Sequence, residues 1–456
     1  MVLVPSDRGE MRQSKLERTR SPSGLLVQSR HLHQLPQNQT HIFSLLNYGA
    51  IGDGVTDDSQ KYLCMAFQEA WNIVCNSSLP SPVLYVPPHK TFLLHPLVLN
   101  GPCKSNNVQI EILGNMVAPS DPSEWQCESH ENTYHCPSWL EFNHVNDLYI
   151  TGGEGDFMID GRGQNWWNLS CHKTMFVIRH SNNVHIGNLN IVNSPNMHMF
   201  FQDSTLVYAY NINISSPGTS PNTDGIHIQH SQNVFVYDSH ISTGDDCISI
   251  ADGSSYLNID TISCGPGHGI SIGSLGIGGE TETVENVHVS NVNFSGTSNG
   301  VRIKTWQGSS AVKVSNVTYN QIYGTSNGTP AIKFDCSEIV PCTDIVLSDI
   351  DISSPRKGKE ASAFCRNVHG RAQGQVVPMV PCLDLSASLS NYPSGAGVVP
   401  TKSSSSFGAD LIADLMLRHK NLLYGGEEDR LTIIFLLRNF LIRRMPLRLL
   451  GTCIIA

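Results

Sequence analysis

The feature that most constrains the fold of this chain is a short strand-like element that recurs through its middle. Its copies alternate β-branched with other residues, at VHI 184–186, VYA 207–209, VFV 234–236, LNI 257–259, VHV 287–289, VKV 312–314 and IVL 345–347. A second series lies between these copies, at GIHI 225–228, CISI 247–250, GISI 269–272 and GVRI 300–303. Alternation with a period of two, without a helical period, predicts β-strands.

The spacing of the two series predicts how the strands are arranged. Two or more short strands in each turn of roughly 22–33 residues indicate a solenoid, whereas a propeller blade needs about 40–45 residues. A β-sandwich gives no reason for so regular a step. Because no coil can bury its apolar side alone, the Ile and Val of each coil must pack against the coils above and below. We therefore predict an all-β fold, a right-handed parallel β-helix.

The repeat also sets the expected domain boundaries. We predict a parallel β-helix domain over residues 42–383, with an N-terminal capping helix within 59–75. Residues 1–41 form an atypical polar and basic extension that lacks the apolar run of a signal peptide. Residues 384–456 lack the repeat and are expected to be an atypical tail outside the solenoid. The apolar end of this tail, 431–456, contains four arginines and a proline, so we expect no membrane span.

Charge and cysteine content narrow the class of partner and the compartment. The formal net charge of −10 argues against a nucleic-acid partner, which would need a basic surface. The chain has 13 cysteines, and the last six before the tail fall into three local pairs without the CxxC spacing of a zinc site. N-x-S/T sequences accompany them along the chain, so we expect a secreted glycoprotein in an oxidising environment.

Polar residues stand out at one place in the second strand series. Asp224, Asp246 and His268 each lie two residues before an Ile of successive strands, at equal intervals. Equivalent positions in successive coils stack about 4.8 Å apart, so we expect these three side chains to form one column. Asp245 lies beside Asp246 at the start of its strand, which adds a third carboxylate to the same place.

Two cations follow on the next strand of the series. Arg302 and Lys304 flank Ile303, so we expect both to point away from the core on the same face. Stacked Asp residues often only cap turns, and exposed Arg and Lys are usually solvated. Like charges at about 5 Å repel each other, however, so carboxylates gathered beside cations indicate a functional site.

The constellation fits the hydrolysis of a glycosidic bond. One carboxylic acid must protonate the leaving oxygen, while an ionised carboxylate activates a water from the opposite side. Mutual repulsion between crowded carboxylates raises the pKa of one of them and keeps it protonated as the acid. Carboxylates on different coils leave room for the water, which predicts inversion of configuration.

Four motifs resemble, in order and spacing, the signatures of the polygalacturonases, glycoside hydrolase family 28. They are NTDG 222–225, GDDC 244–247, GPGHG 265–269 and RIK 302–304. Three further stretches resemble the plant members: GAIGDGVTDD 49–58, IDGRGQNWW 159–167 and NSPNMH 193–198. The resemblance covers about residues 42–383. It implies a β-helix that hydrolyses α-1,4-galacturonosyl bonds in polygalacturonan, the backbone of pectin.

The resemblance also implies a role for each residue. Asp245 would protonate the departing oxygen, and His268 would tune this acid. Asp224 and Asp246 would hold and deprotonate the attacking water. The residues expected to bind substrate are Arg302, Lys304, Asn222 and His198. Arg302 and Lys304 would hold the galacturonate carboxylate at the cleavage point.

Further expectations follow from the same resemblance. It implies three disulfides, Cys247–Cys264, Cys336–Cys342 and Cys365–Cys382. Catalysis of this kind requires no metal and no other cofactor. The expected partner is polygalacturonan, with neither nucleic acid nor membrane, and we expect a monomer in the cell wall or extracellular space.

The chain departs from the family pattern after the RIK motif. Family members carry a substrate-contacting Tyr one coil later, whereas here about one coil is missing between residues 304 and 331. Two other functions stay open. A pectin lyase on the same scaffold would use Ca²⁺ held by carboxylates and a base that abstracts a proton. A catalytically inactive, carbohydrate-binding β-helix would keep the polar column without turnover.

Overall fold

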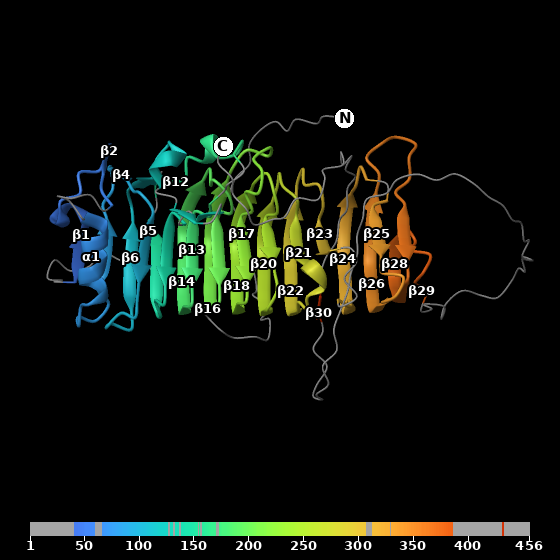
Figure 1. Cartoon of the computed structure of the whole chain (residues 1–456). Helices are drawn as coiled ribbons and strands as arrows, with labels where there is room; N and C mark the ends of the chain where they lie inside the picture. Colours follow the sequence, from blue (N-terminus) through green and yellow to red (C-terminus); the bar gives the residue numbers. More distant parts are fainter. Residues whose placement is uncertain are drawn as a thin grey trace, which may run out of the picture. The chain divides into compact units, whose positions relative to one another are not determined.

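The computed structural model describes most of the chain between residues 41 and 385. The described residues are 41–59, 66–125, 128–130, 133–135, 138–153, 155, 157–169, 173–306, 312–328, 330–385 and 431–432. Their strands are almost all parallel, and over most of the described residues successive coils stack in chain order (Figure 1). The fold is the expected right-handed parallel β-helix, with the handedness that parallel crossovers take. The predictions for residues 1–40 lie outside the described residues.

One face of the solenoid is an eight-stranded parallel sheet, which we call the site sheet. Its strands are β5 Leu97–Asn100, β10 Leu140–Asn143, β13 Phe176–Arg179, β15 Met199–Gln202, β17 Ile226–Gln229, β19 Ile248–Ile250, β21 Ile270–Leu275 and β23 Val301–Thr305. Ile226, Ile248 and Ile270 stack in register and are fully buried. Successive residues of a strand point to opposite faces. The residue after each of these Ile therefore faces outward, in a column across the coils.

The other faces are formed by long strands that bend along their length. They are β14 Asn182–Val192, β16 Thr205–Ser215, β18 Gln232–Ser242, β20 Ser254–Cys264, β22 Val284–Phe294, β24 Ser315–Thr325, β26 Cys342–Ser353 and β28 Val368–Val377. Most of these strands bend at two residues in the left-handed backbone region, such as Asn183 (φ 58°) and Asn188 (φ 57°) of β14 and Leu206 (φ 54°) and Asn211 (φ 49°) of β16. Asn tolerates this conformation better than most residues with a side chain. The Asn211 amide donates to the Asn188 side chain at 2.8 Å, so successive bends are tied together.

The first coils are closed by helix α1, Ala66–Cys75. Its buried face, which includes Phe67 and Trp71, packs against β1, β3 and β5. This confirms the expected capping helix for residues 66–75, whereas 60–65 lie outside the described residues.

The remaining early elements are β1 Ile42–Ser44, η1 Leu45–Tyr48, β2 Asp53–Asp57, β3 Val83–Val86, β4 Thr91–Leu93, β6 Val108–Ile112, β7 Asn115–Val117, η2 Pro122–Trp125, β8 Glu128–His130, β9 Thr133–His135, β11 Leu148–Gly152, β12 Ile159–Asp160 and η3 Gly163–Asn165. Later in the chain, η4 Ile277–Gly279 follows β21.

The stacking is interrupted after β22 and β23. In the described part of the chain, β23 is the last strand of the site sheet, and β25 Ile332–Asp335 pairs only with β27 Ala363–Arg366. Strands β22 and β24 do not pair with each other, and each pairs with β30 Leu431–Thr432. The interruption falls where the sequence indicates a missing coil.

Two short strands correct the expectation that the solenoid ends at residue 383. Strand β29, Asp384–Leu385, pairs with β28, and β30 comes from the segment expected to be a tail outside the solenoid. The rest of that segment lies outside the described residues. Short isolated pairings have no repeat in the sequence, so the pattern did not reveal them.

The structure also corrects the register of one repeat. VKV 312–314 precedes β24, and the residues equivalent to the other copies begin at Val317, which pairs with Ile345. Val317 and Tyr319 point into the core. Asn316 (φ 57°), which has a left-handed backbone conformation, comes directly before Val317, and a residue of this conformation also precedes the repeated triplet in other long strands. Alternation alone did not distinguish the two neighbouring triplets.

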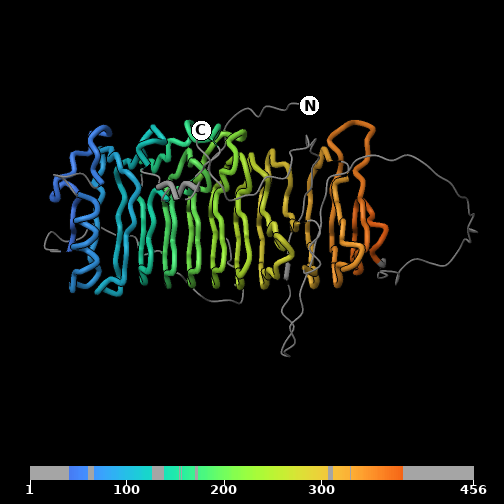
Figure 2. Tube along the Cα trace, in the orientation of Figure 1, coloured from blue at the N-terminus to red at the C-terminus, as the bar shows by residue number. Residues whose placement is uncertain are grey.

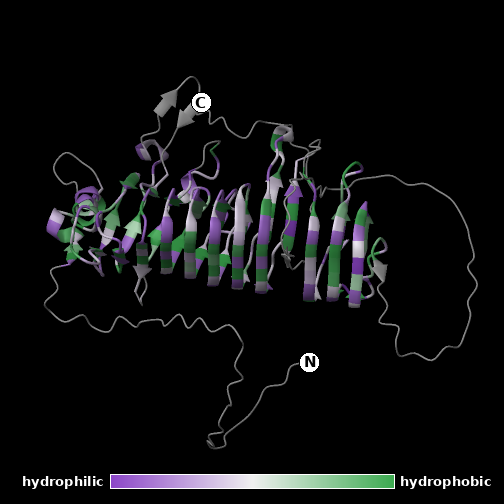
Figure 3. Cartoon of the chain, turned by 90° about the horizontal axis from the view of Figure 1, so that it is seen from below, coloured by the Kyte–Doolittle hydropathy of each residue, from purple (hydrophilic) through white to green (hydrophobic). Residues whose placement is uncertain are grey.

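The coils share one apolar core and are further joined by disulfides. Figure 2 shows the coils following one another along the chain, and Figure 3 shows hydrophobic and hydrophilic residues alternating along their strands. The three expected disulfides, Cys247–Cys264, Cys336–Cys342 and Cys365–Cys382, are confirmed. A fourth, Cys75–Cys103, ties the end of α1 to the segment after β5. Among the described residues, no helix has the length and apolar character needed to cross a membrane.

Candidate active site

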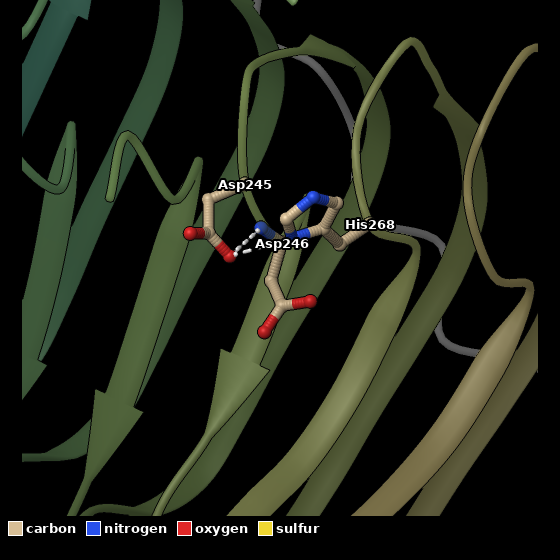
Figure 4. Close-up of side chains that lie close together, drawn as sticks. All are labelled: Asp245, Asp246 and His268. Atoms are coloured by element: carbon tan, nitrogen blue, oxygen red, sulfur yellow. Dashed lines mark hydrogen bonds and ion pairs between the residues drawn. The ribbon is translucent and has the colours of Figure 1, made fainter. Parts of the chain in front are cut away.

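The polar column expected from the sequence lies where the strands of the site sheet begin. The register of β17, β19 and β21 aligns Asp224 with Asp246, and Asp246 with His268. The His268 amide donates to the Asp245 carbonyl at 2.7 Å, which ties two coils together at this point. Figure 4 shows the side chains of Asp245, Asp246 and His268 gathered there, and one carboxylate oxygen or ring nitrogen of each lies within 4.8 Å of those of the other two.

Asp246 is buried, and both of its carboxylate oxygens are paired with cations. Its Oδ1 accepts from Arg302 Nη2 at 2.7 Å, and its Oδ2 accepts from Lys304 Nζ at 2.9 Å. Ser271 Oγ also donates to Oδ1 at 2.7 Å and accepts from Arg302 Nε at 2.7 Å. Only 2% of the Asp246 side chain is exposed, and a buried charge without partners would be strongly destabilising. These contacts therefore compensate for the burial of the carboxylate.

Asp245 lies nearer the surface, with 25% of its side chain exposed, beside His268. His268 Nδ1 is 3.0 Å from Asp245 Oδ1, and the Asp246 amide donates to the same oxygen at 2.8 Å. Burial raises the pKa of Asp245, but the hydrogen bond and charge of His268 and the charge of Lys304 lower it more. The pKa of Asp245 therefore lies below its usual value. The expected contact between His268 and this carboxylate is present.

Asp224 is 8% exposed, and its surroundings favour the protonated carboxyl. Burial, followed by the charges of Asp246 and Asp245, raises its pKa to about 7. Ser249 Oγ donates to Asp224 Oδ2 at 2.5 Å, and this bond and the charge of Lys304 offset the rise only in part. The cluster thus holds carboxyl groups whose pKa values are pushed apart, which is the pattern that acid–base catalysis needs.

The same cluster contains residue types that ligate metals. Asp245, Asp246 and His268 could approach one ion, since their donor atoms lie close together. Asp246 is already paired with Arg302 and Lys304, whose positive charges repel a further cation at this distance. The arrangement fits acid–base chemistry beside a bound anion better than it fits metal ligation.

His198 is not in a position to bind substrate, which corrects the expectation from the sequence. It is 0% exposed, so its imidazole is out of reach of a substrate at the surface. Its Nδ1 lies 3.0 Å from the carbonyl oxygen of Asp224, and its Nε2 lies 2.8 Å from Ser216 Oγ. Burial lowers the pKa of His198 to about 4, so the ring is neutral. His198 therefore holds the backbone that carries Asp224, whereas exposed Asn222 stays a predicted substrate contact.

Three residues of the site were not identified from the sequence: His227, Ser249 and Ser271. They pair in register with one another across β17, β19 and β21, and Ser271 pairs with Arg302 of β23. Each stands between two buried Ile residues, which places it on the outward face like Arg302. That position was the available signal. Neutral polar residues occupy outward positions on many strands, so the pattern alone did not single them out.

Comparison with known proteins agrees with this site. The model of the family described as "Glycosyl hydrolases family 28" matches residues 75–312 and 307–376. The two matched segments meet where the stacking of the coils is interrupted, between β23 and β24. The family match is therefore divided at the same place as the stacking of the coils.

Individual relatives match over most of the chain. It is 39% identical over 393 residues to a probable polygalacturonase of Arabidopsis thaliana, which covers 77% of this chain and 82% of the relative. It is 35% identical over 413 residues to polygalacturonase-2 of Solanum lycopersicum, which covers 79% of this chain and 86% of the relative.

Solved structures share the fold at lower identity. An exopolygalacturonase from Thermotoga maritima has a TM-score of 0.60 at 19% identity and covers 75% of this chain and 92% of its own. An endo-xylogalacturonan hydrolase from Aspergillus tubingensis has a TM-score of 0.59 at 24% identity and covers 75% of this chain and 94% of its own. At these identities the likeness concerns the fold alone.

Proposed function

The chain belongs to glycosyl hydrolases family 28, and we propose that it hydrolyses the α-1,4-galacturonosyl bonds of polygalacturonan. The observation that carries this proposal is the buried Asp246 carboxylate held by Arg302 and Lys304, beside Asp224 and Asp245. Carboxyl groups supply an acid and a base, and the cations supply attraction for an anionic polymer. The relatives that are named polygalacturonases support the same substrate.

In the proposed reaction, Asp245 donates its proton to the glycosidic oxygen as the bond from that oxygen to the anomeric carbon breaks. Asp224 and Asp246 hold a water on the opposite side of the sugar ring. One of these two carboxylates accepts a proton from the water as the water oxygen bonds to the anomeric carbon. Asp224 and Asp245 precede strands of successive coils, β17 and β19, which leaves room for this water. The product then has the inverted configuration.

This assignment requires the electrostatics of Asp245 to change when substrate binds. An acid must hold a proton, yet the pKa of Asp245 lies below its usual value while that of Asp224 lies above. A galacturonate carboxylate bound beside Lys304 adds negative charge and excludes water. Both effects raise the pKa of Asp245 toward the range in which it is protonated. Because these carboxyl groups interact, the proton belongs to the cluster and its position follows the bound charge.

The two other functions receive less support. A lyase needs carboxylates that are available to Ca²⁺, whereas the Asp246 carboxylate is paired with two cations. An inactive binding protein would have no use for carboxyl groups whose pKa values are separated at the same place. Hydrolysis uses both features.

Product analysis tests the proposed function directly. The purified chain is incubated with polygalacturonate, and reducing ends are measured over time. Proton NMR of the first products should show the β-anomer, which then equilibrates, because inversion converts the α-linkage. An unsaturated product that absorbs in the ultraviolet would instead identify a lyase. Binding without release of reducing ends would identify an inactive carbohydrate-binding protein.

We also propose that the enzyme works outside the cell, in the wall, as a monomeric glycoprotein. The four disulfides among the described residues support an oxidising compartment, because such bonds persist outside the cytosol. Two of the N-x-S/T sites, at Asn213 and Asn293, lie exposed on β16 and β22. Cell fractionation, mass measurement before and after deglycosylation, and size-exclusion chromatography test the three parts separately.

A further inference from the structure

The site sheet contains an outward-facing histidine that the proposed mechanism does not use. His227 on β17 lies in register with Ser249 on β19, and its Nδ1 is 2.7 Å from Ser249 Oγ. Ser249 Oγ is in turn 2.5 Å from Asp224 Oδ2. We propose that His227 is a positioning residue, which acts through Ser249 to orient the Asp224 carboxylate toward the attacking water. This inference rests on the proposed hydrolytic function.

The direction of the hydrogen bonds defines the protonation of His227. When Asp224 is ionised, as it must be to act as the base, its carboxylate only accepts, so the single hydroxyl proton of Ser249 goes to Asp224. Ser249 Oγ can then only accept from His227, whose Nδ1 must carry the ring proton while Nε2 does not. Burial lowers the pKa of His227 to about 4, opposed by the charge of Asp246 and assisted by that of Lys304. The ring is therefore neutral above that pH and can keep this tautomer.

Packing restricts both ends of this chain of hydrogen bonds. The ring of Phe200, on the preceding strand β15, meets the His227 ring edge-on with centroids 4.9 Å apart. Ser249 and Asp224 are both buried. Among the described residues, Ser249 is the hydrogen-bond donor to the Asp224 carboxylate. The orientation of that carboxylate therefore depends on where His227 holds the serine hydroxyl.

The arrangement parallels the one at Asp245. There a histidine, His268, contacts the carboxylate directly through Nδ1 at 3.0 Å. At Asp224 the histidine acts through a serine, which leaves the second carboxylate oxygen for the water. A base that must hold a water in line gains from such a fixed carboxylate, because small displacements of a catalytic group are costly to the rate.

Substitutions of His227 separate positioning from packing. His227→Asn places an amide near the original Nδ1 and can still donate to Ser249, whereas His227→Gln reaches toward Nε2 and cannot. We expect His227→Gln to lower kcat on polygalacturonate on the order of tenfold with little change in KM, and His227→Asn to stay within about threefold of wild type. The control is His185→Gln, since His185 is also partly buried but stacks between Tyr149 and Tyr208 outside the site sheet. It should leave kcat unchanged.

A double-substitution cycle and a pH profile test whether the effect passes through Ser249. Ser249→Ala removes the link, so adding His227→Gln should cause no further loss. The serine bond lowers the pKa of Asp224. Its loss should therefore move the acidic limb of kcat/KM to higher pH in both single variants. Asp245, Asp246 and Lys304, which also face Asp224, are unchanged in these proteins.

Three results would overturn the inference: wild-type kcat in His227→Gln, losses that multiply in the double variant, or a change confined to KM. If wild type itself releases no reducing ends, the proposed function fails, and the inference is then judged on structure alone. Nitrogen-15 NMR of histidine-labelled protein, with the His227 signal assigned from the Gln variant, reports the tautomer without any activity. The spectra are recorded well above the pKa of Asp224, so that its carboxylate is ionised; a proton on Nδ1 then supports the inference, and a bare Nδ1 contradicts it.

Discussion

Lys304 contacts the buried carboxylate and, in the proposed function, the substrate, so its removal should have two measurable effects. Its Nζ lies 2.9 Å from Asp246 Oδ2, and Asp246 would still keep Arg302 at 2.7 Å. A hydrogen bond to a charged group contributes about 1.5–3 kcal/mol. Since about 1.4 kcal/mol corresponds to a factor of ten, Lys304→Ala should lower kcat/KM on polygalacturonate by about 10- to 150-fold.

The chain provides a matched control for this substitution. Asp335 is also buried, and it is also held by a lysine and an arginine, with Lys333 Nζ at 3.0 Å and Arg366 Nη2 at 2.7 Å. These residues belong to the separate β25–β27 sheet. Lys333→Ala should therefore lose a contact of the same kind, and a similar amount of stability, without the loss in kcat/KM.

Two substrates and one stability measurement complete the test. Reducing-end release is measured on polygalacturonate and on highly methyl-esterified pectin, and thermal unfolding is followed for both variants. If Lys304 binds the galacturonate carboxylate, the loss should be smaller on the esterified polymer, which has fewer charges. Equal losses on both substrates would refute this role. An equal loss of activity in Lys333→Ala would show that activity follows stability rather than substrate binding.

Three further outcomes are expected. Asp245→Asn should lower kcat by about 10²–10⁴ while calorimetry shows near-normal oligogalacturonate binding, and retention of more than about a tenth of kcat would exclude Asp245 as the acid. The pKa of Asp224 is raised from 3.8 to about 7, so between these pH values the folded state holds a proton that the unfolded state releases. The free energy of unfolding that this group contributes therefore falls as pH rises through this interval. The melting temperature of Asp224→Asn, measured relative to that of wild type, should therefore be higher at pH 7 than at pH 4. A difference between the two proteins that does not change with pH would contradict the raised pKa. His198→Ala should lower the unfolding free energy by about 1–3 kcal/mol and reduce kcat, because the Asp224 backbone loses its support; a change in KM alone would restore His198 as a substrate contact.

The solenoid could be predicted because its constraint is local and repeated. Each coil must bury a small set of Ile and Val residues against its neighbours, so the alternation recurs at nearly constant spacing and outweighs any single ambiguous triplet. The same spacing placed Asp224, Asp246 and His268 in one column, since equivalent positions in successive coils must stack. The same alternation along β23 predicted that Arg302 lies on the outward face.

Contacts between coils could be decided only by the tertiary structure. Whether a histidine faces the substrate or the interior depends on packing around it, which is why His198 resembled a binding residue in sequence and is buried beneath Asp224 in the fold. The hydrogen bonds from His227 through Ser249 to Asp224 join residues 22 and 25 positions apart, and no local pattern sets their geometry. The pKa of Asp224 likewise depends on burial and on neighbouring charges. Residue type and spacing determine which groups meet, whereas their protonation and orientation depend on distances that only the folded chain defines.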